Sequence, residues 1–127
     1  MEITLPATRE APSMARDALR KIPEAAPCLH KRGPDLELLV SELVTNSVRH
    51  AGLPTSGLIS MHVAIQAGYL RIEVSDPGKG FTLLTAGEPR EAAESGWGLK
   101  LVERLADGWG MARTYAGVTT VWFEMHL

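Results

Sequence analysis

The sequence has only one cysteine, Cys28, among its 127 residues. An internal disulfide needs two cysteines, and no CxxC pair or cysteine/histidine cluster offers the spacing of a zinc site. The fold must therefore rest on its hydrophobic core. We expect Cys28 to be a small buried hydrophobic residue rather than a nucleophile.

Long apolar runs are also missing. No stretch approaches the roughly 18 uninterrupted apolar residues of a membrane span, and Glu2, Arg9 and Glu10 interrupt any secretory signal near the start. We expect a cytoplasmic protein with no membrane partner. The formal net charge is only -2, which gives no electrostatic reason to expect direct binding of nucleic acid.

Apolar material is nevertheless sufficient for a core. With 45% hydrophobic and 22% charged residues, the chain has the composition of one compact domain. No internal repeat, linker or low-complexity segment divides it. We expect residues 1–127 to form a single domain.

Periodicity predicts helices and strands in a mixed order. We expect strands at 2–7, 59–65, 70–74, 109–115 and 119–127, and helices from 11 to about 29, from 34 to 51 and from 98 to 106. Pro23 and Pro27 should end the first helix and leave an irregular tail. The turn at Ala67-Gly68 makes neighbouring strands antiparallel. The predicted fold class is α+β, a two-layer α/β sandwich with a mixed, mostly antiparallel sheet.

One stripe of the helix at 34–51 carries polar side chains. Glu42, Asn46 and Arg49 fall within it at helical spacing, and the opposite side is apolar. An amide oxygen is a hard ligand for Mg²⁺, and a carboxylate can polarise a water or a hydroxyl group. Taken alone, however, an ordinary solvated helix face explains the stripe better.

The first of two glycine loops, VSDPGKGF, follows a predicted strand. Asp76 stands at its edge, and Gly78 and Gly80 allow a planar ring to approach the backbone closely. A carboxylate can accept a hydrogen bond from an exocyclic amine such as that of adenine. The alternative is a simple turn, because Asp-Pro-Gly is good turn chemistry.

The second loop, SGWGLKLVERLAD, runs directly into a helix. Gly98, Leu99 and Lys100 can present unpaired backbone N–H groups to phosphate oxygens. The sequence contains neither a GxxxxGK[ST] loop nor a GxGxxG fingerprint, so those two nucleotide folds are disfavoured. Alternatively, the loop is a glycine-softened helix entrance that Ser95 caps, and Trp97 covers a nucleotide or simply packs.

The order of these segments resembles the GHKL ATPase superfamily, whose Bergerat fold occurs in gyrase and histidine kinases. The most similar branch is that of the anti-sigma-factor serine kinases. The helix SELVTNSVRHAG (N box, about 35–51) is similar to the N box of the superfamily, and residues 74–81 and 95–107 are similar to its two glycine boxes. Residues 82–95 correspond to the ATP lid. The resemblance implies helices on one face of the sheet.

The resemblance also implies roles for single residues. Glu42 corresponds to the general base or water-positioning residue, Asn46 to the Mg²⁺ ligand and Asp76 to the adenine-binding carboxylate. The remaining implied ATP contacts are Gly78, Gly80, Ser95, Gly96, Trp97, Gly98, Leu99, Lys100 and Thr119. Thr119 matches a family threonine near adenine, although Val118 stands where glycine is more usual, and Thr120 is an alternative.

Two functions remain open, because one fold can host several reactions. The first is a serine/threonine protein kinase that phosphorylates a small antagonist protein. The second is an ATP-responsive module that binds a sigma factor or another regulator without phosphate transfer. We expect neither the dimerisation helices of a histidine kinase nor the transducer domain of a clamp ATPase. The resemblance further implies a homodimer, and an unrelated α+β domain is the residual interpretation.

Overall fold

The computed structural model describes residues 1–50, 57–76, 96–113 and 117–126. The helical segments are α1 (Ala11–Arg20), a 3₁₀ turn at Pro23–Ala25, α2 (Ala26–His50) and α4 (Gly96–Leu105). The strands are β1 (Glu2–Pro6), β2 (Leu58–Gln66), β3 (Tyr69–Asp76), β4 (Gly108–Arg113) and β5 (Thr119–His126). Within the described ranges, no helix is long and apolar enough to cross a membrane.

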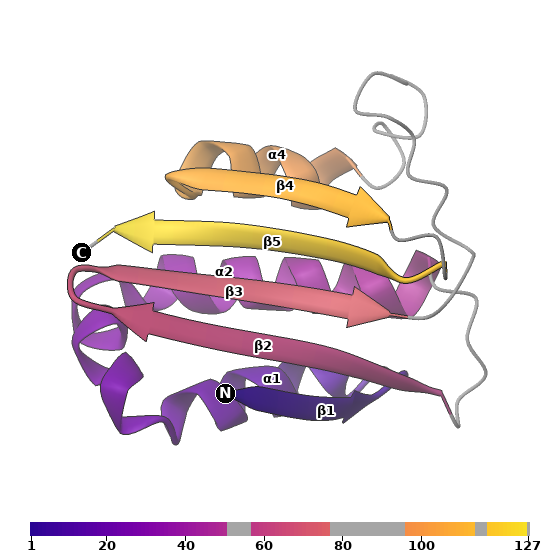
Figure 1. Cartoon of the computed structure of the whole chain (residues 1–127), viewed down its shortest axis with the longest axis horizontal. Helices are drawn as coiled ribbons and strands as arrows, with labels where there is room; N and C mark the ends of the chain where they lie inside the picture. The colour runs from indigo at the N-terminus through magenta and orange to yellow at the C-terminus, as the bar shows by residue number, and fades with distance from the viewer. Residues whose placement is uncertain (51–56, 77–95, 114–116, 127) are drawn as a thin grey trace.

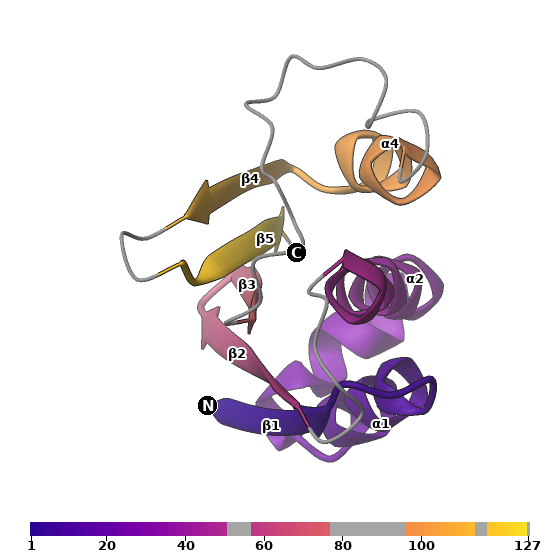
Figure 2. The ribbon, with the colours of Figure 1, turned by 90° about the vertical axis from the view of Figure 1, so that its right-hand side faces the viewer.

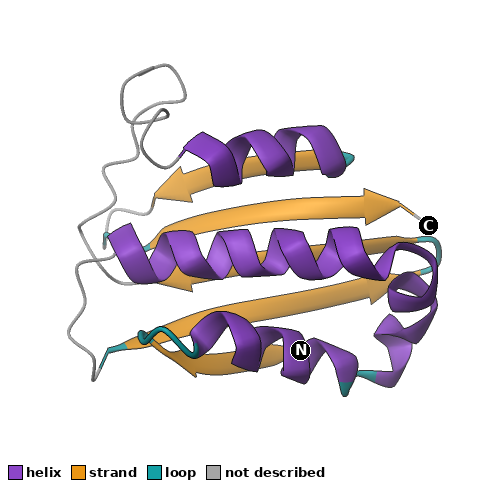
Figure 3. Cartoon of the chain, turned by 180° about the vertical axis from the view of Figure 1, so that it is seen from behind, coloured by secondary structure: helices purple, strands orange, loops and turns teal. Residues whose placement is uncertain are grey.

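The five strands form one sheet in the order β1-β2-β3-β5-β4 (Figure 1). Every pair of neighbours in it is antiparallel, so the mixed sheet that we expected contains no parallel pair among the described strands. The helices lie together on one face (Figures 2 and 3). The predicted α+β sandwich is confirmed.

The core lies between the sheet and the helices. Along β3 and β5, buried residues alternate with half-buried ones, as expected for strands with one covered face. The buried set on these strands is Leu70, Ile72, Val74, Val121, Phe123 and Met125. From α2 the core receives Leu36, Leu39, Val40, Leu43 and Val44. Because α2 packs on both β3 and β5, this helix is fixed over the centre of the sheet.

Two expectations about the first helices are wrong. Helix α1 ends at Arg20, and the segment after it is a 3₁₀ turn followed by the start of α2 rather than an irregular tail. Proline is tolerated in the first turn of a helical segment, where its missing N–H is not needed, and Pro23 and Pro27 both occupy such positions. Each proline therefore lies in the first turn of a helical segment here.

The second difference is a kink in α2. Arg32 has non-helical angles (φ -136°, ψ 31°), two residues before Pro34. Proline cannot donate a hydrogen bond to the carbonyl group four residues earlier, and its ring crowds that group. The predicted helix start at Pro34 therefore corresponds to the straight part of α2 beyond the kink.

An exposed ion pair joins α1 to α2. The Arg20 guanidinium donates to both carboxylate oxygens of Glu37, at 2.9 and 2.6 Å, and to Asp17 at 2.9 Å. The hydrogen bonds from Arg20 lower the pKa of Glu37. The pair therefore stabilises the folded state only while Glu37 is ionised.

The variant Glu37→Gln tests this dependence on pH. The pKa of Glu37 is lower in the folded protein than its ordinary value of about 4.3, so its stabilising contribution is present above that value and lost as the pH falls through the folded-state pKa. At pH 7 the variant should unfold a few degrees below wild type at most. The difference should shrink below about pH 4. Thermal unfolding between pH 7 and 3 measures it, and a constant difference would contradict the ion-pair explanation.

The helix-free face of the sheet carries a polar network around Arg71. This guanidinium donates to Glu73 and Glu124, both at 2.8 Å, and lies 4.0 Å from the centre of the Trp122 ring. The indole covers Gly110, where an added Cβ would lie 2.7 Å from a ring carbon. Glycine is therefore required at this position of β4 unless Trp122 moves.

Candidate functional site

Four element termini that are far apart in the sequence lie at the same side of the molecule. They are the end of α2, the end of β3, the beginning of β5 and the beginning of α4, all at the right of Figure 1. The two adjoining strand ends are in register, because Asp76 pairs with Thr119. The fold thus gathers the N box helix and parts of both glycine boxes at one end of the sandwich.

Asn46 lies on the covered side of α2. Asn46 is only 7% exposed, whereas Glu42 is half-buried and Arg49 is exposed. Because Asn46 is buried rather than exposed to solvent, the solvated-face interpretation does not hold for it. Of the three residues in the predicted polar stripe, it is the one that the fold covers most.

Asp76 is a buried acid at the end of β3, with 3% of its surface exposed. A carboxylate is rarely so buried unless it is paired or bonded, and Asp76 does have an interaction partner. It lies on the helix-covered face, in line with Ile72 and Val74. This placement directs the acid toward the helix layer.

The strand register separates the two candidate threonines. Thr119 is paired with Asp76 and is 1% exposed, so it shares the covered face. Thr120 is paired with Ser75, and their hydroxyl oxygens are 2.8 Å apart on the helix-free face. Of the two, only Thr119 is on the same face as Asp76.

The Thr119 hydroxyl shows that the region suits a polar ligand. Its Oγ1 atom is buried and has no hydrogen-bond partner within the described part of the chain. Leaving a buried hydroxyl unpaired costs about 1–3 kcal/mol. A polar ligand or an ordered water beside Asp76 would satisfy it.

Helix α4 begins at Gly96, two residues earlier than predicted. Gly96, Trp97, Gly98, Leu99 and Lys100 therefore form its first residues rather than a loop before it. The first N–H groups of a helix have no partner within the helix and favour anions. Lys100 is exposed and already has an interaction partner.

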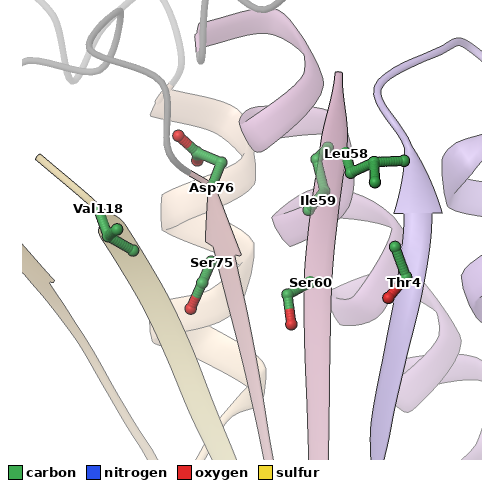
Figure 4. Close-up of a pocket in the computed structure, with 7 residues that line it drawn as sticks. All are labelled: Thr4, Leu58, Ile59, Ser60, Ser75, Asp76 and Val118. Carbon is green, nitrogen blue, oxygen red and sulfur yellow. The ribbon is translucent and has the colours of Figure 1, made fainter. Parts of the chain in front are cut away.

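A pocket of about 180 Å³ lies next to Asp76 (Figure 4). It is lined by Thr4, Leu58, Ile59, Ser60, Ser75, Asp76 and Val118. Neither Glu42 nor Asn46 contributes, and Ser60 and Ser75 belong to the helix-free face. The pocket therefore adjoins the candidate site without being the space between Asp76 and α2.

Several predicted site residues lie outside the described residues. They are Gly78, Gly80 and Ser95, together with the lid at 82–95. One buried polar residue was not predicted: Ser47, next to Asn46, is 4% exposed. Its signal was present, because Ser47 continues the helical spacing of Leu36, Val40 and Leu43. Among the described residues, no three histidine, cysteine, aspartate or glutamate side chains cluster as a metal site.

An antiparallel sheet covered on one face by helices, with a buried asparagine, aspartate and threonine at one end, has the architecture of the GHKL class of domains. The chain belongs to the histidine kinase-like ATPase domain family, whose sequence model matches residues 5–125. The family resemblance inferred from the three motifs is thereby confirmed.

Similar proteins include a serine-protein kinase and two solved structures. The serine-protein kinase RsbW of Listeria monocytogenes is 35% identical over 116 residues, which cover 83% of this chain and 74% of that protein. The solved RsbU and RsbW domains of a Mycobacterium tuberculosis protein superpose with a TM-score of 0.69 at 26% identity, covering 100% of this chain and 31% of that one. The SiaB–SiaC complex of Pseudomonas aeruginosa shares the fold alone, with a TM-score of 0.73 and 14% identity over 98% of this chain and 88% of that one.

Proposed function

We propose that this chain binds Mg-ATP at the end of the sandwich where Asn46, Asp76 and Thr119 lie, and transfers the terminal phosphate to a serine or threonine of a small antagonist protein. The observation that carries the proposal is the set of three buried polar residues there, next to the first turn of α4. The similarity to serine-protein kinases supports the type of acceptor.

The base and the phosphates would be held by different elements. Asp76 accepts a hydrogen bond from the exocyclic amine of adenine, and Thr119 Oγ1, which lacks a partner among the described residues, takes part in the same contact. The N–H groups at the start of α4 bind phosphate oxygens. This division assigns base recognition to β3 and β5 and phosphate binding to α4.

Glu42 and Asn46 are one helical turn apart on α2, so both can face the same phosphate group. Glu42 accepts the proton of the incoming hydroxyl group, the hydroxyl oxygen bonds to the terminal phosphorus, and the bond to the ADP oxygen breaks. Asn46 Oδ1 is the proposed Mg²⁺ ligand. The ion compensates the charge of the phosphates when bound.

A transfer assay tests the proposed activity. The protein is mixed with radiolabelled ATP, Mg²⁺ and purified antagonist-domain proteins encoded next to its gene. We expect label on one of them, at a serine or threonine, and none when EDTA removes the Mg²⁺. If ATP binds but every candidate stays unlabelled while one forms a complex, the chain is instead an ATP-responsive binding module for a sigma factor or another regulator.

A further inference from the structure

A guanidinium ties the end of α4 to the kink of α2. Arg32 Nη2 donates to the backbone carbonyl of Leu105 at 2.9 Å, and Arg32 Nη1 donates to the Asp107 carboxylate at 3.3 Å. Leu105 is the last residue of α4, and a cation is favourable at the C-terminal end of a helix. We call this set, Arg32 with the Leu105 carbonyl and Asp107, the Arg32 clasp.

Asp107 connects the clasp to the sheet. Its carboxylate accepts a hydrogen bond from the His126 backbone N–H at 2.7 Å, and its own N–H donates to the Glu124 carbonyl at 2.9 Å. The bond from His126 lowers the pKa of Asp107, and the charge of Arg32 acts in the same direction. Asp107 is therefore ionised at neutral pH, as pairing with Arg32 requires.

The clasp starts from the kink residue of α2. Arg32 is the residue at which α2 leaves helical geometry, and its side chain is 27% exposed. The Asp107 side chain is 43% exposed, so water screens the ion pair, and the partly buried hydrogen bond to the Leu105 carbonyl is the better protected part of the clasp. Asp35, on the straight part of α2, lies 3.9 Å from the same guanidinium. The clasp thus joins three elements, α2, α4 and β5, at one point.

The clasp lies at the opposite end of α4 from the candidate site (Figure 1). A helix of 10 residues is about 15 Å long and moves as a rigid rod at this length. Fixing its last carbonyl group therefore restricts where its first N–H groups point. Val102, which is fully buried, packs the middle of the helix against the core.

We propose that Arg32 is a positioning residue: through the clasp it holds α4 in the orientation in which its first turn binds the nucleotide phosphates. The proposal rests on the proposed function. On this proposal Arg32 contributes to binding of the phosphates and does not contribute to binding of the base, which Asp76 and Thr119 hold from the sheet.

Calorimetric titration of the full chain with ATP and with adenosine separates an effect on phosphate binding from an effect on base binding. Arg32→Met should weaken binding of ATP about tenfold and change binding of adenosine less than twofold. Arg32→Lys should recover part of the loss, because one ammonium group can reach the Leu105 carbonyl but lacks the two-pronged geometry that also reaches Asp107. A defect that merely destabilised the fold would weaken the binding of ATP and of adenosine alike.

The matched control is Arg20→Met, which removes a cation that joins α1 to α2 without reaching α4. It should leave both affinities unchanged. Amide hydrogen exchange without nucleotide should rise across α4 in Arg32→Met and not in Arg20→Met. Equal losses for ATP and adenosine, or none, would overturn the positioning role, whereas a wild-type chain that binds neither ligand would overturn the proposed function itself.

Discussion

Asparagine in place of Asp76 should lower the affinity for ATP by about a hundredfold and leave the protein folded. The exchange removes a negative charge and turns one acceptor oxygen into a donor amide at a position that is 3% exposed. Losing a hydrogen bond from a buried charged group costs about 1.5–3 kcal/mol, and each 1.4 kcal/mol is a factor of about ten in Kd. Calorimetric titration with Mg-ATP measures the loss.

Glu73→Gln is the matched control, because it makes the same acid-to-amide change on the same strand but on the helix-free face. There Glu73 accepts from Arg71, outside the candidate site. Its ATP affinity should equal that of wild type. Unchanged binding in Asp76→Asn, with its thermal midpoint near that of wild type, would show that Asp76 does not hold the base.

The strands could be predicted from the sequence because their signals are local. In β3 and β5, apolar residues alternate with polar ones, and Gly68 adopts a positive φ of 76° in the turn between β2 and β3. The kink at Arg32 could not be predicted. It depends on which of several nearby prolines begin helical segments and on a contact with Leu105, 73 residues away.

The site was predictable as a set of residue types but not as an arrangement. Motif order pointed to Glu42, Asn46 and Asp76, yet periodicity placed Asn46 on a polar stripe, and only packing shows that it is buried. Alternation in β5 already puts Thr119 on the face of Val121, but its position directly opposite Asp76 depends on register. Register is a property of two paired strands, and neither strand encodes it alone.

Glutamine in place of Glu42 should reduce phosphate transfer by about a hundredfold to a thousandfold, which lies within the usual contribution of a general base. The change is nearly isosteric, and by replacing the carboxylate with a neutral amide it removes the ability to take the hydroxyl proton. Because Glu42 is half-buried and is assigned no contact with the base, the Kd for Mg-ATP should stay within about twofold of wild type. The initial rate of labelling of the acceptor protein measures transfer, and titration measures binding.

Comparison with Glu37→Gln, the same substitution five positions earlier on α2, separates chemistry from stability. Glu37 bonds to Arg20, so that variant should lose a little stability and transfer phosphate at the wild-type rate. Wild-type transfer rates in Glu42→Gln would mean that the hydroxyl group loses its proton without help from this carboxylate, and Glu42 would then have no catalytic role.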